Sequence, residues 1–435
     1  MDNKVTNFIC PSCGSSLKFD ATEQNIKCPY CDSEFSIEDI KAMSEEKAAD
    51  FEDETNWDTS DSAQLFSNAE KEGMTSYLCD ACGGEVICGE NTSSTSCPYC
   101  GNNVLIKKNL SGALKPKYII PFAKTNDDAL KSLQEYMKGK VLLPKVFKAE
   151  NKIKEIKPLY VPYWLYDADV DARIHYTGKK VRHWSDSNYE YTETSYFSIV
   201  REGEIAYEHL PVDASKSIDN KLTESIEPYN FSSTKEFEMP YLAGYMSDKY
   251  DEDAEQCSVR ATQRIKEGTE IAFRETVEGY NEVTTDSCNI KLSNTKAEYA
   301  LFPMYILNTK WKDQNYTFGM NGETGKIKGD LPLDKAKFFI WLLWQFVAYG
   351  GLLGLLFSFF DNDPTNKAIL IVIGAVIGLI ISLIVTFSLK GQLKGVKYQV
   401  GSRNYYKDNS MHLDICTDRF MYKRTTKRRI NNNKD

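Results

Sequence analysis

Cys10-Pro11-Ser12-Cys13 and Cys28-Pro29-Tyr30-Cys31 form a pattern that returns 69 residues later as Cys79-Asp80-Ala81-Cys82 and Cys97-Pro98-Tyr99-Cys100. In each copy, 14 residues separate the two Cys-x-x-Cys pairs, which leaves room for two short strands and a turn. A Cys-x-x-Cys pair on a tight turn directs two sulfur atoms at one centre, and a second pair completes a tetrahedron around a metal ion. The pattern therefore predicts two zinc ribbons.

Each ribbon is expected to be a structural metal site and not a catalytic one. Four thiolates fill the tetrahedral coordination of Zn²⁺ and leave no open position for a substrate or a water molecule. Roughly 10 to 16 kcal/mol of apparent binding free energy would stabilise a unit too small to have a core. We expect two structural zinc ions. Their ligands would be Cys10, Cys13, Cys28 and Cys31 in the first ribbon, with strands at 17–19 and 24–27, and Cys79, Cys82, Cys97 and Cys100 in the second.

Other uses of these cysteines fit the sequence less well. A disulfide framework needs an oxidising compartment, and no signal peptide precedes Cys10. Thioredoxin-like chemistry needs a single Cys-x-x-Cys at a strand-to-helix junction, whereas these motifs come in pairs. Iron of the rubredoxin type suits the ligands equally well, but the sequence shows no redox partner. Cys88 takes the repeat position of Phe19 and is expected to pack as a small apolar residue.

Two long apolar runs near the other end predict a transmembrane hairpin over 335–390. Residues 338–360 and 368–389 contain no charge, and each run is long enough to cross a hydrocarbon core of about 30 Å as a helix. A buried helical hairpin is the alternative, but it would show shorter runs broken by polar residues. Lysines flank the outer ends of both runs, so the positive-inside rule predicts a two-pass cell-membrane protein with both termini in the cytoplasm. Five glycines are expected to let the helices approach closely: Gly350, Gly351, Gly354, Gly374 and Gly378.

The remaining sequence predicts an acidic linker over 41–76 and an α+β domain over 109–334. Thr125 is an expected N-cap for a helix over 127–138, and 251–277 has the apolar spacing of a long amphipathic helix. Strands are expected at 118–122, 159–176, 191–201 and from 289 onward, with a hairpin turn at 321–325. Two aromatic segments, 159–167 and 300–308, resemble each other, and the internal proline of each predicts an edge strand or a bulge.

The sequence gives no support for an enzyme. The four histidines, His175, His183, His209 and His412, are far apart, and none lies beside a nucleophile elbow, a metalloprotease motif or a phosphate-binding loop. Aromatic side chains of the middle region can line a ligand groove, but core packing explains them more often. We therefore predict a binding function.

Charge separates two kinds of binding. The chain carries a net charge of −9; the segment from Lys390 carries twelve basic and four acidic residues, which leaves −17 for the rest. An acidic surface repels a phosphate backbone, so we expect the ribbons and the α+β domain to bind proteins, with nucleic acid as the alternative. The basic tail over 391–435 is expected to contact anionic lipid at the inner membrane surface. Its last cluster comprises Lys423, Arg424, Lys427, Arg428 and Arg429.

Several of these motifs together resemble a bacterial family. They are the Cys-Pro-x-Cys-Gly start, Leu159-Tyr160-Val161-Pro162-Tyr163-Trp164, Tyr241-Leu242-Ala243-Gly244-Tyr245, and Asn321-Gly322-Glu323-Thr324-Gly325-Lys326. The family carries the label transcription-factor-IIB-type zinc ribbon-containing protein, or sometimes primosomal helicase, although this chain has no Walker phosphate loop. The resemblance implies a zinc-binding membrane protein, and the architecture is similar to zinc-ribbon adaptors of phage-shock and flotillin-type envelope-stress systems.

The expected fold is therefore multidomain. A first zinc ribbon over 1–40, the acidic linker and a second zinc ribbon over 77–108 precede the α+β cytoplasmic domain, the two-helix transmembrane hairpin and the basic tail. The expected function is that of a membrane-anchored adaptor or scaffold in envelope maintenance or stress response. The alternative is a membrane-tethered protein that binds nucleic acid through its ribbons.

Overall fold

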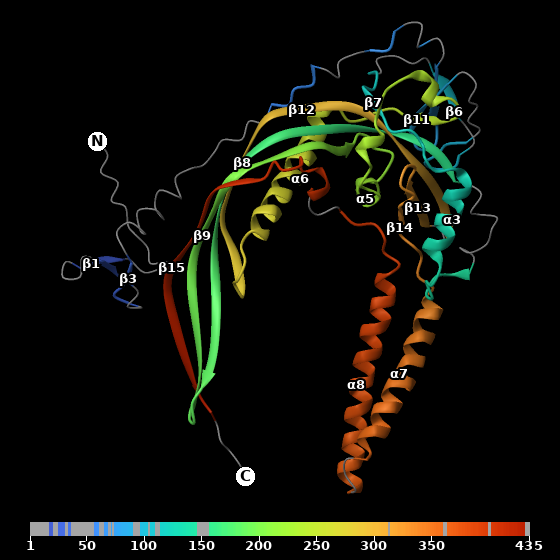
Figure 1. Cartoon of the computed structure of the whole chain (residues 1–435). Coiled ribbons are helices and arrows are strands. Elements are labelled where there is room, and N and C mark those ends of the chain that lie inside the picture. The colour runs from blue at the N-terminus through green and yellow to red at the C-terminus, as the bar shows by residue number, and fades with distance from the viewer. Residues whose placement is uncertain are drawn as a thin grey trace.

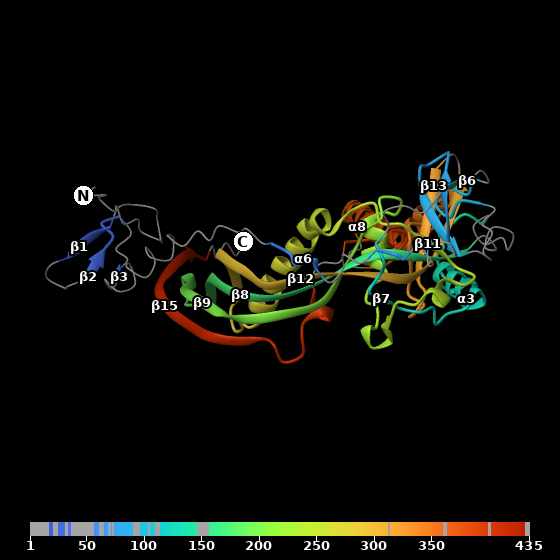
Figure 2. The same cartoon turned by 90° about the horizontal axis from the view of Figure 1, so that it is seen from above.

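The computed structural model describes most of the chain and contains a large mixed sheet. The described residues are 17–20, 25–30, 34–35, 56–60, 65–67, 71, 74–89, 96–102, 105–108, 114–145, 156–311, 314–359, 363–398 and 402–430. Within them, twelve strands form one sheet, and five α-helices and a separate three-stranded sheet accompany it. Two of the helices are apolar and extend away from the sheet (Figure 1), and Figure 2 shows the molecule from above, nearly along the axis of α8.

Three very long strands form the centre of the large sheet and give it the shape of an arch (Figure 1). β8 (Lys157–Ser185) lies between β9 (Tyr189–Asp213) and β12 (Glu282–Trp311), antiparallel to both. β15 (His412–Arg429) adds to the outer side of β9. Strands of globular proteins are usually about five or six residues long, so strands of this length must bend. Bulges on both neighbours of β8 face its residues 167–169, where His209 and Asn294 adopt left-handed φ angles of 56° and 48°.

The two similar aromatic segments pair with each other. Val161 lies opposite Phe302, and the pairing is symmetric about that point. Both segments lie in the centre of the sheet, which corrects the expectation of edge strands. Each proline nevertheless lies at a place where strand pairing on the outer side is interrupted. Beside Pro162 the outer neighbour of β8 changes from β11 (Met246–Asp248) to β9, and beside Pro303 that of β12 changes from β7 (Tyr118–Ile119) to β13 (Gln314–Asn321). The missing N–H of each proline therefore interrupts no ladder.

The helices expected at 127–138 and 251–277 begin within three residues of those positions. Thr125 and Asp128 form a capping box at the start of α3 (Asn126–Met137), and Asp253 and Gln256 do the same for α6 (Ala254–Glu275). α6 buries Ala254, Cys257, Ala261 and Ile265 against the inner side of the arch, at the three- and four-residue spacing of one helix face. The short helix α5 (Asn220–Ser225) lies between β9 and β11 in the chain.

The apolar helices α7 (Lys335–Phe357) and α8 (Pro364–Gly391) are both long and apolar enough to cross a membrane. They pack against each other through glycines. A Cβ at Gly374 would lie 2.8 Å from the Gly354 nitrogen, and one at Gly378 would overlap the backbone of Gly350. The expected glycine contact is therefore confirmed at four positions, whereas Gly351 has nothing within 4 Å. Gln345 and Thr386 form a buried hydrogen bond of 3.2 Å inside the pair.

Backbone hydrogen bonds join the helix pair to the sheet. The Leu331 N–H, which follows β14 (Ile327–Gly329), donates to the Leu393 carbonyl after α8 at 2.8 Å. The Asp334 N–H before α7 donates to Leu142, and the Lys337 ammonium donates to Leu143 at 2.6 Å. α7 and α8 therefore leave the body at a defined place, beside α3 and β14.

Three segments expected as separate units take part in the main body. Trp57 and Phe66, from the expected acidic linker 41–76, are buried in the main core. The strands β4 (Met74–Cys79), β5 (Glu85–Gly89) and β6 (Leu105–Lys108) of the expected second ribbon continue the large sheet, because β5 pairs with β11. The expected basic tail 391–435 contains the sheet strand β15. The described residues of these three segments therefore belong to the same body as the long strands.

The small sheet contains β1 (Lys18–Asp20), β2 (Asn25–Lys27) and β3 (Glu34–Phe35) in antiparallel order. The first two strands confirm the expected strands of the first ribbon to within a residue or two at each end. Short η-helices, Phe231–Ser233, Met239–Leu242 and Arg403–Tyr405, and the two-residue strand β10 (Lys235–Glu236) complete the described elements.

Candidate metal centre

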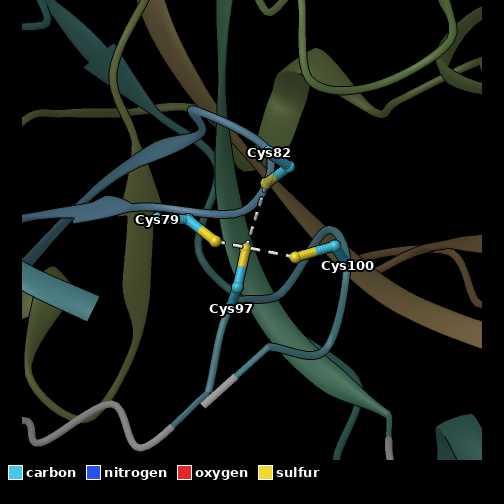
Figure 3. Close-up of side chains that lie close together, drawn as sticks. All are labelled: Cys79, Cys82, Cys97 and Cys100. Atoms are coloured by element: carbon cyan, nitrogen blue, oxygen red, sulfur yellow. Dashed lines mark hydrogen bonds between the residues drawn. The ribbon is translucent and has the colours of Figure 1, made fainter. Parts of the chain in front are cut away.

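The first half of the centre is the turn between β4 and β5. Cys79 ends β4, and its N–H and carbonyl bond to Gly84 and Gly83 at 2.9 Å each. Gly83 has a φ of +76°, a left-handed conformation that glycine adopts without steric cost. This tight turn directs the sulfur atoms of Cys79 and Cys82 toward the same point (Figure 3).

The second half repeats the same turn. The Gly101 N–H donates to the Cys97 carbonyl at 3.1 Å, the Cys97 N–H donates to Asn102 at 2.7 Å, and Gly101 has a φ of +74°. The glycine after the second cysteine of each pair therefore has a physical reason: only a residue that accepts a left-handed φ closes the turn without strain.

The four sulfur atoms have the spacing of a tetrahedral metal site. Cys79 Sγ lies 3.6 Å from Cys100 Sγ, and Cys82 Sγ lies 3.7 Å from Cys97 Sγ. All four lie within 4.8 Å of one another (Figure 3). A metal–sulfur distance of about 2.3 Å corresponds to sulfur–sulfur edges of about 3.8 Å in a regular tetrahedron. The prediction that these four cysteines come together is confirmed, and the cluster can hold a metal ion.

The thiols of the cluster differ in their acidity. Burial raises the pKa of Cys97 and of Cys82, because a low-dielectric environment disfavours the thiolate. Burial also opposes ionisation of Cys79, but backbone N–H groups of Cys82 and Ala81 outweigh it and lower the pKa of Cys79 to about 7. Four thiolates at these distances repel one another, and a bound cation is the group that keeps all four deprotonated.

Side chains from the long strands hold the second turn in place. The Lys157 ammonium, at the start of β8, donates to the carbonyls of Ser96 at 3.2 Å and Cys97 at 3.4 Å. Asn308 of β12 donates its amide to the carbonyls of Pro98, at 2.8 Å, and Tyr99. The Tyr99 ring packs against Gly84, where a Cβ would lie 2.5 Å from the ring. The centre is therefore attached to β8 and β12.

The first expected site is only partly within the described residues. Cys28 is fully buried and belongs to a small cluster with Phe35, beside Leu17 and Ile26. Cys10, Cys13 and Cys31 lie outside the described residues. The zinc site of the first ribbon therefore stays a prediction.

The cysteines without an expected ligand role lie away from the cluster. Cys88 is buried on β5, as expected for a small apolar strand residue, and burial raises its pKa to about 11. Cys257 is buried on α6, whereas Cys288 and Cys416 are exposed. The exposed pair provides natural controls for experiments on the centre.

The structure also brings together three residues that the sequence did not single out. Asp167, His209 and Glu298 each offer a ligand atom within 4.8 Å of the others, at the bulge of β8 and β9. Lys117 and Lys296 contact Glu298 at 2.5 and 2.7 Å, so its charge is already balanced. The group is better described as an ion-pair network. No local spacing could have revealed it, because its members lie on three strands.

The expected lipid-contacting residues belong to β15 and lie along β9. Lys423 contacts Glu193 at 3.3 Å, Lys427 lies opposite Tyr191, and Arg428 lies opposite Glu190. Arg424 and Arg429 face Thr194 and Tyr189 in the same register. These residues are exposed, and they are set on a paired strand.

Comparison with known proteins gives one relative that matches most of this chain. The chain is 29% identical over 337 residues to "Uncharacterized protein YdjG" of Bacillus subtilis (strain 168), in an alignment that covers 78% of this chain and 93% of the relative. No protein family matches the sequence by its family model, and no solved structure matches it. The name of the relative assigns no activity, so any function must be argued from the residues described above.

Proposed function

We propose that this protein is a two-pass membrane anchor that presents a structural zinc centre and its sheet to protein partners on the cytoplasmic side, in envelope maintenance or stress response. The observation that carries this proposal is the four-sulfur cluster fastened to the same body from which two apolar helices extend. A metal ion held by four cysteines would keep the surface of the two turns in one conformation. The two apolar helices would hold that surface beside a bilayer.

The chemistry of the buried polar groups supports binding and not catalysis. With four thiolates the metal keeps no open position. Asp213 and Glu227, two deeply buried carboxylates, are held by Arg260 at 3.1 Å and Arg264 at 2.7 Å. Carboxylates engaged in this way hold α6 to β9 and to the segment after α5, and they are not free to move protons.

Partner recovery from solubilised membranes tests the adaptor proposal. We expect Cys82→Ser with Cys100→Ser to abolish recovery of a reproducible partner set while the protein still resists alkaline extraction from membranes. Cys288→Ser with Cys416→Ser removes two exposed thiols away from the cluster and is expected to leave recovery intact. If both double variants return the same proteins as the wild type, the adaptor proposal fails.

Metal analysis tests the identity of the ion. We expect close to one zinc for the second ribbon in the purified chain, and a second zinc if Cys10, Cys13, Cys28 and Cys31 form the other site. Cys82→Ser should remove one of them. An iron content with the absorption of an iron–thiolate centre would replace zinc with the rubredoxin-type alternative.

Thiol accessibility tests the topology. Cys416 is exposed on β15, beyond α8, so a membrane-impermeant maleimide should leave it unlabelled in intact cells and label it after lysis. Labelling of Cys416 before lysis would place the body outside and contradict the proposed orientation.

A further inference from the structure

The free end of the arch is built from three strands. Residues 186–188 connect β8 to β9, and β15 ends beside them, with Arg429 opposite Tyr189 and Lys427 opposite Tyr191. The Ile430 N–H donates to the Asn188 carbonyl at 2.9 Å. Figure 1 shows this end far from the β4–β6 end of the sheet. The basic cluster of the C-terminal segment is therefore fixed at the end of a β-hairpin.

Side chains alternate between the two faces of a sheet, so the register decides which of these residues share a face. Trp184 lies opposite Tyr191, and Tyr191 lies opposite Lys427. One face, here called the tip face, therefore combines aromatic and basic side chains. It comprises Lys180, Arg182 and Trp184 of β8, Tyr189 and Tyr191 of β9, and Lys423, Lys427 and Arg429 of β15. Arg424 and Arg428 lie on the opposite face.

Contacts among these side chains order the tip face. The rings of Trp184 and Tyr191 stack at 5.4 Å with an angle of 7° between their planes. The guanidinium of Arg182 lies 5.7 Å from the Trp184 ring, and the ammonium of Lys427 lies 5.5 Å from the Tyr189 ring. Trp184 remains 40% exposed. The tip face therefore presents a partly exposed aromatic ring beside cationic side chains.

The charge of this end contrasts with the rest of the chain. Residues 179–193 and 419–430 contain nine basic and three acidic residues, a net charge of +6 in a chain of net charge −9. Two carboxylates lie beside the tip face: Glu193 contacts Lys423 at 3.3 Å, and Asp186 accepts a hydrogen bond from the Tyr191 hydroxyl at 2.9 Å. Arg429 and Lys427 have no carboxylate directly opposite in the register, where Tyr189 and Tyr191 lie.

We propose that the tip face binds the anionic phosphate headgroups of the bilayer into which α7 and α8 insert, an inference that rests on the proposed membrane anchoring. Trp and Tyr are favoured at membrane interfaces, and Lys and Arg attract anionic lipid. The arm that carries the tip face and the α7–α8 pair extend from the arch in the same direction, and the end of the arm lies level with the helix pair (Figure 1), so the arm is long enough to reach the bilayer surface. A bilayer contact involves this end alone, whereas a long nucleic acid would also meet the acidic remainder of the chain.

Photo-crosslinking in vesicles tests this site with the full chain. Benzoylphenylalanine replaces Ser187, an exposed residue of the hairpin turn, or the exposed Asp80 near the metal centre as a control. The protein is reconstituted in phosphatidylcholine alone or mixed with phosphatidylglycerol. We expect lipid adducts at position 187 but not at position 80. They should be at least about fivefold more abundant with phosphatidylglycerol, the effect of one basic side chain near anionic lipid.

Two double variants of β15 distinguish lipid binding by the tip face from a general effect of net charge. Lys427→Gln with Arg429→Gln removes two charges from the tip face and should abolish the gain from phosphatidylglycerol. Arg424→Gln with Arg428→Gln removes two charges from the opposite face of β15 and should preserve it. Equal adducts in both lipids, or equal losses in both variants, would overturn the proposal.

Controls distinguish this failure from failure of the anchor or the adaptor. Resistance to alkaline extraction reports insertion of α7 and α8, and inserted protein without adducts at position 187 overturns the lipid site alone. Loss of insertion overturns the anchor and this site together. If the tip-face variant instead loses salt-sensitive retention of single-stranded DNA with lipid adducts unchanged, the face is a nucleic-acid site and the lipid proposal is wrong. Partner recovery with the cysteine variants tests the adaptor independently.

Discussion

At the residue scale, Asp248 shows how burial changes acidity in this protein. It lies on β11, is 1% exposed, and its burial raises its pKa to about 7, while contacts with Ser215 and Tyr99 oppose the rise. A carboxyl whose pKa is higher in the folded state than in the unfolded chain favours folding at low pH, and that contribution is lost as the pH rises from about 4 to about 7. Full ionisation costs on the order of 4 kcal/mol by this linkage.

Replacing this carboxyl should therefore alter the pH dependence of stability. We expect Asp248→Asn to unfold at nearly the same temperature as the wild type at pH 4 and at a clearly higher temperature at pH 8. Thermal unfolding in detergent across this range measures the difference between the two proteins, which cancels the effects of groups they share. A difference that stays constant, or that shrinks with rising pH, would contradict the assignment of this titration to Asp248.

A buried ion pair offers a second test at this scale. Arg264 of α6 is bidentate to Glu227, with contacts of 3.2 and 2.7 Å, and Tyr405 donates to the same carboxylate at 2.6 Å. Arg264→Ala leaves a buried charge without its partner and should cost about 3 to 5 kcal/mol. Arg403→Ala breaks an exposed pair with Glu275 at 3.4 Å and should cost less than about 1 kcal/mol. Similar losses of thermal stability in the two variants would argue against the structural role of the pair.

At the element scale, the α7–α8 pair depends on which glycines face the contact. Gly378 lies against the backbone of Gly350, whereas Gly351 has nothing within 4 Å. Alanine is the better helix former by about 1 kcal/mol, so Gly351→Ala should be neutral or slightly stabilising. Gly378→Ala should separate the helices and lower the unfolding temperature in detergent. Equal behaviour of the two variants would show that close packing of these helices does not stabilise the pair.

Elements also show where sequence reasoning succeeds. Caps and apolar spacing are local, so Thr125, the apolar spacing of 251–277 and the two apolar runs locate α3, α6, α7 and α8 to within a few residues. The spacing of the four later cysteines is equally local, and they meet as expected. Pairing between distant strands is not local. Pro162 and Pro303 suggested edges, and only the register shows that they lie where one neighbouring strand gives way to another.

At the scale of the whole molecule, the same limit explains the domain boundaries. Composition separated an acidic linker, a ribbon and a basic tail, because each stretch differs in charge from its neighbours. The large sheet joins parts of all three through contacts that composition does not encode: Asp58 with Lys296, β5 with β11, and β15 with β9. The cluster of Asp167, His209 and Glu298 and the tip face depend on the same long-range register.

This continuity gives the metal centre an expected influence beyond its own turns. β4, β5 and β6 reach β8 through β11, and Lys157 and Asn308 connect the second turn to the long strands. Removing the ion with a chelator, or by Cys82→Ser, should free the two turns from each other, because their cysteines are then no longer joined through the metal. Hydrogen exchange is then expected to accelerate in β4, β5, β6 and β11. It should stay unchanged in α6 and in the β8–β9 hairpin end, which have no contact with the centre.

Exchange measured by mass spectrometry on the full chain in detergent, with Cys416→Ser as the control for loss of an exposed thiol, distinguishes three outcomes. Faster exchange confined to the cysteine turns would mean that the ribbon is an independent unit and that its pairing through β11 adds no stability. Faster exchange throughout the sheet would mean that the arch unfolds as one cooperative body with the centre. Faster exchange that extends through β11 and ends within β8 is the result that the strand order predicts, because each step away from the centre adds pairing that does not depend on the metal.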